Sequence, residues 1–116
     1  MSEKPTARLY RWDSMEAKEV VEGVWRRVIP GDGVMLAHFR LGKGAVVSMH
    51  SHPNEQVSHL LEGAMRFHVG EGAEEVILRA GEVLHLPSGV PHSAEALEDC
   101  VAVDAFSPPR AEWLKG

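Results

Sequence analysis

Two histidines separated by a single residue, His50 and His52, are the first residues of this sequence whose types and spacing point to chemistry. Residues two apart on an extended chain point to the same face, so the two imidazoles converge on one point. Gln56 comes four residues later, past a Pro-containing turn, and its side-chain carbonyl can face the same point. His92 follows a Pro-Ser-Gly turn and a second proline, which together fix where it emerges. These four residues are candidate ligands for one divalent metal ion, although a polar strand edge also produces a His-x-His pair.

A second group of candidates lies in the last apolar run and just after it. Asp104 is the only carboxylate within residues 101–106, and a carboxylate in an apolar setting has a raised pKa that suits acid and base work. The planar guanidinium of Arg110 can donate two parallel hydrogen bonds to one carboxylate. Each candidate also has a simpler, structural interpretation. Asp104 could pair with Arg110 or with a turn amide, Arg110 could be a solvated surface residue, and Phe106 could belong to the core.

The segments that must position these residues are predicted to be β-strands. Short, mostly apolar runs are separated by turns that nearly all contain glycine, which predicts an all-β sandwich or barrel. Residues 13–22 fit either a short helix capped by Asp13 or an extended arm, and the tail after Ser107 predicts a turn with one helical turn at most. The expected strands are 24–29, 34–41, 45–49, 56–61, 64–69, 75–79, 83–86, 92–96 and 101–106.

Length and composition limit the class of protein. A chain of 116 residues, 44% hydrophobic and 25% charged, predicts one ordinary globular domain: an arm over 1–22, a barrel over 23–107 and a C-terminal turn over 108–116. No apolar run approaches the ~20 residues that span a bilayer, and the N-terminus lacks the apolar stretch of a secretory signal, so we expect a soluble, cytoplasmic protein without membrane contact. A net charge of -5 without a basic run argues against a nucleic-acid partner.

The remaining histidines and the single cysteine are not assigned chemistry. The lone Cys100 lies in an apolar stretch and is interpreted as a buried, inert thiol, and one cysteine excludes an intramolecular disulfide. The other histidines occur singly within expected strands, where they are interpreted as surface or hydrogen-bonded residues: His38, His59, His68 and His85.

The spacing of these residues resembles the two motifs of the cupin superfamily. The first motif, Gly-x5-His-x-His-x3-Glu-x6-Gly, is matched from Gly44 to Gly63 with Gln56 in place of the glutamate. The second, Gly-x5-Pro-x-Gly-x2-His-x3-Asn, is matched from Gly81 to His92, with Ala96 in place of the asparagine. The resemblance implies a cupin double-stranded β-helix, a jelly-roll barrel, with a metal site. Neutral ligands would leave a bound ion its full +2 charge, and mixed nitrogen and oxygen ligands suit Zn, Ni, Co, Fe and Mn.

Within the superfamily, the sequence is most similar to KdgF-like cupins of pectin degradation. The run His-Ser-His-Pro-Asn-Glu-Gln over 50–56 and the tail Asp-Ala-Phe-Ser-Pro-Pro-Arg over 104–110 carry this likeness, which extends over about 23–114. It implies an enzyme that converts a 4,5-unsaturated monouronate, released by polysaccharide lyases, into its linear ketonic form. It also implies that Asp104, Phe106 and Arg110 line the pocket for a carboxylate-bearing small molecule. Finally, it implies a homodimer with N-terminal strands exchanged or packed across the interface.

Two other functions are compatible with the same residues. Three histidines and a glutamine could hold Fe(II) in a dioxygenase, which requires O₂, whereas linearisation requires none. A binding module that senses a sugar acid would leave its ligand unchanged. Fold alone does not separate these alternatives.

Overall fold

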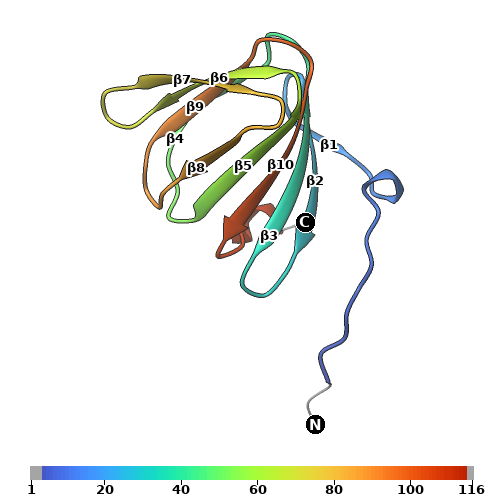
Figure 1. Ribbon diagram of the computed structural model, residues 1–116. Helices are drawn as coiled ribbons and strands as arrows, with labels where there is room; N and C mark the ends of the chain where they lie inside the picture. Colours follow the sequence, from blue (N-terminus) through green and yellow to red (C-terminus); the bar gives the residue numbers. More distant parts are fainter. Residues whose placement is uncertain (1–3, 115–116) are drawn as a thin grey trace.

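The computed structural model describes residues 4–114, and in this part of the chain it contains ten β-strands and two short 3-10 helices (Figure 1). Nine of the strands are those expected from the sequence, with ends that differ by at most one residue. In chain order the elements are η1 (Trp12–Ser14), β1 (Lys18–Val21), β2 (Val24–Pro30), β3 (Met35–Leu41), β4 (Val46–His50), β5 (Glu55–Glu62), β6 (Ala64–Val69), β7 (Glu74–Arg79), β8 (Val83–Leu86), β9 (His92–Ala96), β10 (Cys100–Ser107) and η2 (Ala111–Trp113).

The strands form two sheets that enclose the core between them (Figure 1). The larger sheet has the order β1-β2-β3-β10-β5-β8 and the smaller sheet has the order β4-β9-β6-β7. Neighbouring strands pair antiparallel throughout both sheets. This arrangement confirms the expected all-β jelly-roll barrel. Because some neighbours in the sheets, such as β3 and β10 or β4 and β9, are far apart in the sequence, residues from distant segments meet inside the barrel.

Alternating burial along the strands separates the barrel interior from its surface. In β5, Gln56, Ser58 and Leu60 are buried while the residues between them are exposed, the period-two pattern of a strand with one face on the core. The side chains on β10 divide the interior, because Ala102 belongs to the main core cluster and Phe106 belongs to a smaller one with Met35 and Ala37. Between them on the same face stands Asp104. The main cluster comprises Val24, Leu41, Ala45, Leu60, Met65, Phe67, Leu78, Ala94, Ala96, Cys100 and Ala102, so Cys100 is buried as expected.

The segment 13–22 contains no α-helix, so that alternative was wrong. The chain makes the single 3-10 turn η1 and then enters β1, which pairs with β2 at the edge of the larger sheet. Two contacts favour the strand: Val20 packs against the main core cluster, and the Glu19 carboxylate accepts a hydrogen bond from the Gly23 backbone N–H at 3.0 Å. Residues 4–11 are exposed and run away from the barrel (Figure 1).

The C-terminal segment folds back toward the barrel and contains η2, in agreement with the expected single helical turn. The buried Asn54 anchors this segment: its Nδ2 donates to the carbonyl oxygens of Pro108 at 2.6 Å and Pro109 at 3.3 Å. As a result, the residues of the tail are held close to the loop between β4 and β5. No helix among residues 4–114 has the length and apolar character needed to cross a membrane.

Candidate metal centre and its pocket

Strand register brings three of the predicted ligands together. The last residue of β4, His50, pairs directly with the first residue of β9, His92, and His52 lies two residues beyond His50 in the loop before β5. One ring nitrogen from each of the three histidines lies within 4.8 Å of the other two. His52 and His92 are buried and His50 is partly buried. The cluster is therefore close enough for one ion and reachable from the pocket.

Backbone carbonyls orient all three imidazoles in the same way. The Nδ1 atoms of His50, His52 and His92 lie 2.8, 3.0 and 2.9 Å from the carbonyl oxygens of Ser48, Asn54 and Val90. A carbonyl only accepts, so each Nδ1 carries the hydrogen and each Nε2 keeps a free lone pair for a metal. Burial lowers the pKa of His52 and His92, which keeps them in the neutral form that metals bind.

The surroundings of two of the Nε2 atoms are suited to a bound cation. The Nε2 of His92 is buried and has no hydrogen-bond partner within the described residues. The Nε2 of His52 lies 3.0 Å from Gln56 Oε1, and with its ring hydrogen on Nδ1 it has nothing to donate to that oxygen. Two acceptor atoms thus face each other, which a shared cation would stabilise. The donor set of this structure fits a metal ion.

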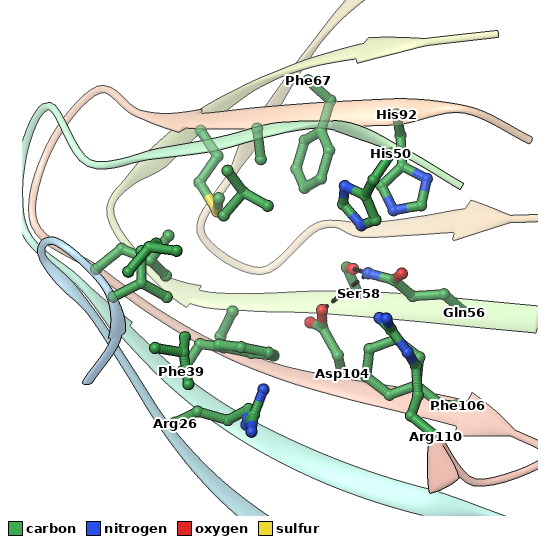
Figure 2. A pocket seen from close by; sticks show the side chains of 18 of the residues that line it. Arg26, Phe39, His50, Gln56, Ser58, Phe67, His92, Asp104, Phe106 and Arg110 are labelled. Atoms are coloured by element: carbon green, nitrogen blue, oxygen red, sulfur yellow. Dashed lines mark hydrogen bonds between the residues drawn. The ribbon is translucent and has the colours of Figure 1, made fainter. Parts of the chain in front are cut away.

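Gln56 connects the histidines to the acid of the pocket. Its Nε2 donates to Asp104 Oδ2 and to Ser58 Oγ, each at 3.0 Å (Figure 2). This orientation turns Oε1 toward His52. These side chains face one another because Asp104 pairs with Ser58, and Phe106 with Gln56, across β10 and β5. The amide oxygen therefore lies next to the histidine cluster, and its role as a fourth, neutral ligand stays a prediction.

Asp104 is a buried carboxyl with an unusual acidity. Burial raises its pKa to about 7, and hydrogen bonds from Ser58 and Gln56 oppose that rise only in part. Its Oδ1 is buried without a hydrogen-bond partner among residues 4–114. Asp104 is hydrogen-bonded to Gln56 and not ion-paired with Arg110, so the structural pairing considered from the sequence is absent. A carboxyl with this pKa exchanges a proton readily near neutral pH.

The cluster opens into a cavity of about 140 Å³ inside the barrel. Figure 2 shows His50 and His92 on one side of this cavity, with Asp104, Phe106 and Arg110 on the other. The inner wall is apolar, and the polar groups gather near the histidines and the C-terminal segment. The apolar wall includes Val24, Leu41, Val47, Met65, Phe67, Leu78, Ala94 and Ala102.

Arg110 and Phe106 both line the cavity, and the binding role that the resemblance implied for them stays a prediction. Phe106 is only 2% exposed, and its ring centroid lies 5.8 Å from that of His52. The Arg110 guanidinium lies 5.5 Å from the Phe106 ring centroid and 4.2 Å from that of Trp113. Its Nε and Nη2 both contact Glu112 Oε2 at 2.8 Å. Phe106 thus serves the core and the pocket wall together, and Arg110 is only slightly exposed rather than solvated.

The histidines outside the cluster take no part in it. His85 pairs with the Glu55 carboxylate at 2.7 Å on the surface, and His38 lies against Trp12 with ring centroids 5.3 Å apart. His59 is exposed and His68 is partly buried.

Sequence reasoning did not identify Ser58, Arg26 or Trp113 as pocket residues, although all three line the cavity. A period-two signal was present for two of them. Ser58 lies two residues after Gln56, and Arg26 alternates with Val24 and Val28 along β2. Trp113 had no such signal, because its position depends on how the tail folds back.

The fold and the site define a cupin. A cupin domain (Cupin_2) matches residues 37–106, more than half of the chain and the part that holds all four candidate ligands. This chain belongs to the cupin family. A comparison with curated proteins finds no match.

Solved structures give more particular likenesses. KdgF from Halomonas sp. is 25% identical, with a TM-score of 0.87 over 93% of this chain and 99% of that one. An RmlC-like cupin from Shewanella frigidimarina NCIMB 400 is 27% identical, with a TM-score of 0.82 over 93% of this chain and 96% of the other. Oxalate decarboxylase from B. subtilis is 19% identical, with a TM-score of 0.76 over 90% of this chain and 30% of that one. The last likeness concerns the fold alone.

The arrangement of the ligands predicts that His52→Ala loses bound metal. Removing this imidazole deletes one ligand and frees Gln56 Oε1 from its neighbour, so affinity should fall by more than the ~10- to 100-fold typical of losing an outer partner. The measurement is elemental analysis of protein purified without chelators, together with zinc titration. His59→Ala is the matched control, since it removes an exposed histidine outside the cluster. Equal metal content in parent and His52→Ala would refute the site.

Proposed function

We propose that this cupin is a metal-dependent enzyme that converts 4,5-unsaturated monouronates into their linear keto forms. The observation that carries the proposal is the chain of contacts from His52 through Gln56 to Asp104, which joins a neutral ligand set to a buried acid. The likeness to Halomonas KdgF over nearly the whole of both chains supports the same function.

The reaction is an isomerisation that needs only proton movements. In the cyclic substrate, the hemiacetal O1–H loses its proton, the C1–O5 bond breaks, and C1 becomes a carbonyl. The electron pair released to O5 gives an enolate over O5, C5 and C4, and a proton then adds to C4 to give the ketone at C5. One proton is removed and one is added, so no oxidant or reductant takes part.

His50, His52, Gln56 and His92 would hold one divalent ion in this pocket. When bound, such an ion supplies Lewis acidity that polarises a substrate oxygen, and with four neutral ligands it would retain its full +2 charge. This charge also favours an anionic substrate. The chain's own contribution is to keep the imidazoles neutral and the amide oxygen pointed at them.

Asp104 would move the proton. A pKa of about 7 leaves both protonation states populated at neutral pH, so the carboxyl can take a proton from one atom and return it to another. The Gln56 amide fixes Oδ2, and Oδ1, which has no hydrogen-bond partner among residues 4–114, would be the oxygen that exchanges the proton. On the same side of the cavity, Arg110 carries donors for the uronate carboxylate.

Turnover of a 4,5-unsaturated monouronate tests the proposal directly. Metal-loaded protein should remove the absorbance of the substrate's conjugated double bond, both in air and without O₂. Chelator treatment should abolish the activity and added divalent metal should restore it. Strict dependence on O₂ would favour a dioxygenase, and an unchanged ligand with every plausible metal would favour a binding module; either result refutes linearisation.

Substitutions of the two polar pocket residues should have separable effects. Asp104→Asn should lower kcat by about 10²- to 10⁴-fold, the range of general acid-base groups, with metal content intact. Arg110→Lys keeps the charge but loses the two-pronged geometry, so it should raise KM with a smaller loss of kcat. Steady-state kinetics on metal-loaded protein measure both. If Asp104→Asn matches the parent, Asp104 is structural and the proton donor lies elsewhere.

We further propose that the protein forms a symmetric homodimer through the outer face of its larger sheet. Cross-strand pairing aligns Ile29, Leu36, Ala105 and Val57 in one apolar row over four strands, and Leu36 and Val57 are exposed. Light scattering at tens of micromolar protein should give a dimer mass. Val57→Glu should shift the mass toward the monomer, while Val46→Glu, on the exposed edge of the other sheet, should not. A monomeric parent would contradict the dimer.

A further inference from the structure

Arg26 is a charged residue on the inner face of a barrel strand. It alternates with Val24 and Val28 along β2, and both of those valines pack into core clusters. Figure 2 shows Arg26 below Phe39, on the side of the cavity that also carries Asp104 and Arg110. The adjacent Arg27 makes a different contact, because its Nε donates to the Met15 carbonyl at 2.9 Å. Two neighbouring arginines thus have different surroundings.

The position of Arg26 carries an electrostatic cost in the free protein. No carboxylate among residues 4–114 lies within ion-pair distance of its guanidinium. Burial lowers its pKa, the nearby charge of Arg110 lowers it further, and Glu112 only partly opposes them. A partly buried cation without a close counter-charge is unfavourable unless an anion binds beside it. The chain as a whole carries a net charge of -5, so this local excess of positive charge runs against the sign of the molecule.

Trp113 holds the two pocket arginines in one cluster. The Arg26 Cζ lies 4.1 Å from the centroid of the Trp113 ring and the Arg110 Cζ lies 4.2 Å from it. Contacts of this kind fix a guanidinium plane through cation–π attraction while its N–H groups remain available. In Arg110, two of these donors already contact Glu112. The fork of Arg26 has no such partner in the described part of the chain.

We propose that Arg26 is a carboxylate-binding residue of this pocket, which receives the acid group of the ligand beside the Trp113 ring. The inference rests on the proposed function in that it needs an acidic small molecule in the cavity. It deepens that function by assigning the acid group to the side occupied by Arg26, Trp113 and Arg110, across the cavity from His50 and His92. The pocket then selects a carboxylate over a neutral sugar of the same size.

The test compares Arg26→Gln with Arg27→Gln in metal-loaded protein. One measurement is KM and kcat for a 4,5-unsaturated monouronate. The other is calorimetric binding of D-galacturonate, which carries the acid group but no 4,5 double bond, with neutral D-galactose as its counterpart. Losing a hydrogen bond to a charged group should weaken binding of both acids by about 10- to 100-fold and leave kcat nearly unchanged. Arg27→Gln should behave like the parent, and neither change should alter metal content.

Further outcomes separate the inference from the proposed function. Galacturonate binding that depends on Arg26, without conversion of the unsaturated monouronate, would refute the function and support the inference. Equal acid binding by parent and Arg26→Gln, or no acid binding by the parent, would overturn the inference. If Arg26→Gln unfolds at a lower temperature, Arg26→Lys separates loss of stability from loss of the acid contact. The lysine keeps a point charge, so this variant should show an intermediate loss of acid affinity and the same affinity for galactose as the parent.

Discussion

The pairing of β10 with β3 on one side and β5 on the other sets the geometry of the whole pocket. Strand register decides which side chains stand opposite one another, and here it places Asp104 opposite Ser58 and Phe106 opposite Gln56. A slip by one residue would turn Asp104 to the outer face and bring Val103 into the barrel. The acid, the amide and the aromatic wall are therefore products of one register, and the paired ends of β4 and β9 bring the imidazoles to meet them.

Most of the fold could be predicted because its signals are local. Turns that mostly contain glycine separate the apolar runs of nine strands, and strands such as β5 and β9 bury alternate residues. β1 lacked such a signal, because Lys18 and Glu19 are polar and the strand is stabilised by its pairing with β2 and by the packing of Val20. The pairing order of the sheets is likewise a tertiary property, which a single sequence does not reveal without the likeness to a known barrel.

The candidate site was also predictable only in part. The histidines and Gln56 stand at fixed spacings in two short motifs, so sequence alone indicated a common point. The sequence did not indicate the hydrogen-bond network of the site. This network comprises the carbonyls that orient each imidazole, the bond from the Gln56 amide to Asp104, and the contacts of the Arg110 donors with Glu112. The Gln56–Asp104 bond joins segments 48 residues apart. The imidazole–carbonyl contacts and the Arg110–Glu112 contact join residues only two apart, and they depend on the local backbone conformation. Alternation along β2 did carry the information that Arg26 faces inward, since it places a charged residue between a buried valine, Val24, and a partly buried one, Val28, which is costly without a counter-charge.

Asn54 contacts two parts of the molecule that are far apart in the sequence. Its carbonyl oxygen accepts the Nδ1–H of His52, and its side-chain amide holds the carbonyls of Pro108 and Pro109. The same short loop thus sets the direction of one imidazole and keeps the C-terminal segment docked. Thermodynamic linkage makes such an arrangement reciprocal. An interaction that stabilises the orientation of His52 therefore also stabilises the docked C-terminal segment, and detachment of that segment would make the imidazole more mobile. The position of the C-terminal segment and the geometry of the histidine cluster are thus energetically coupled.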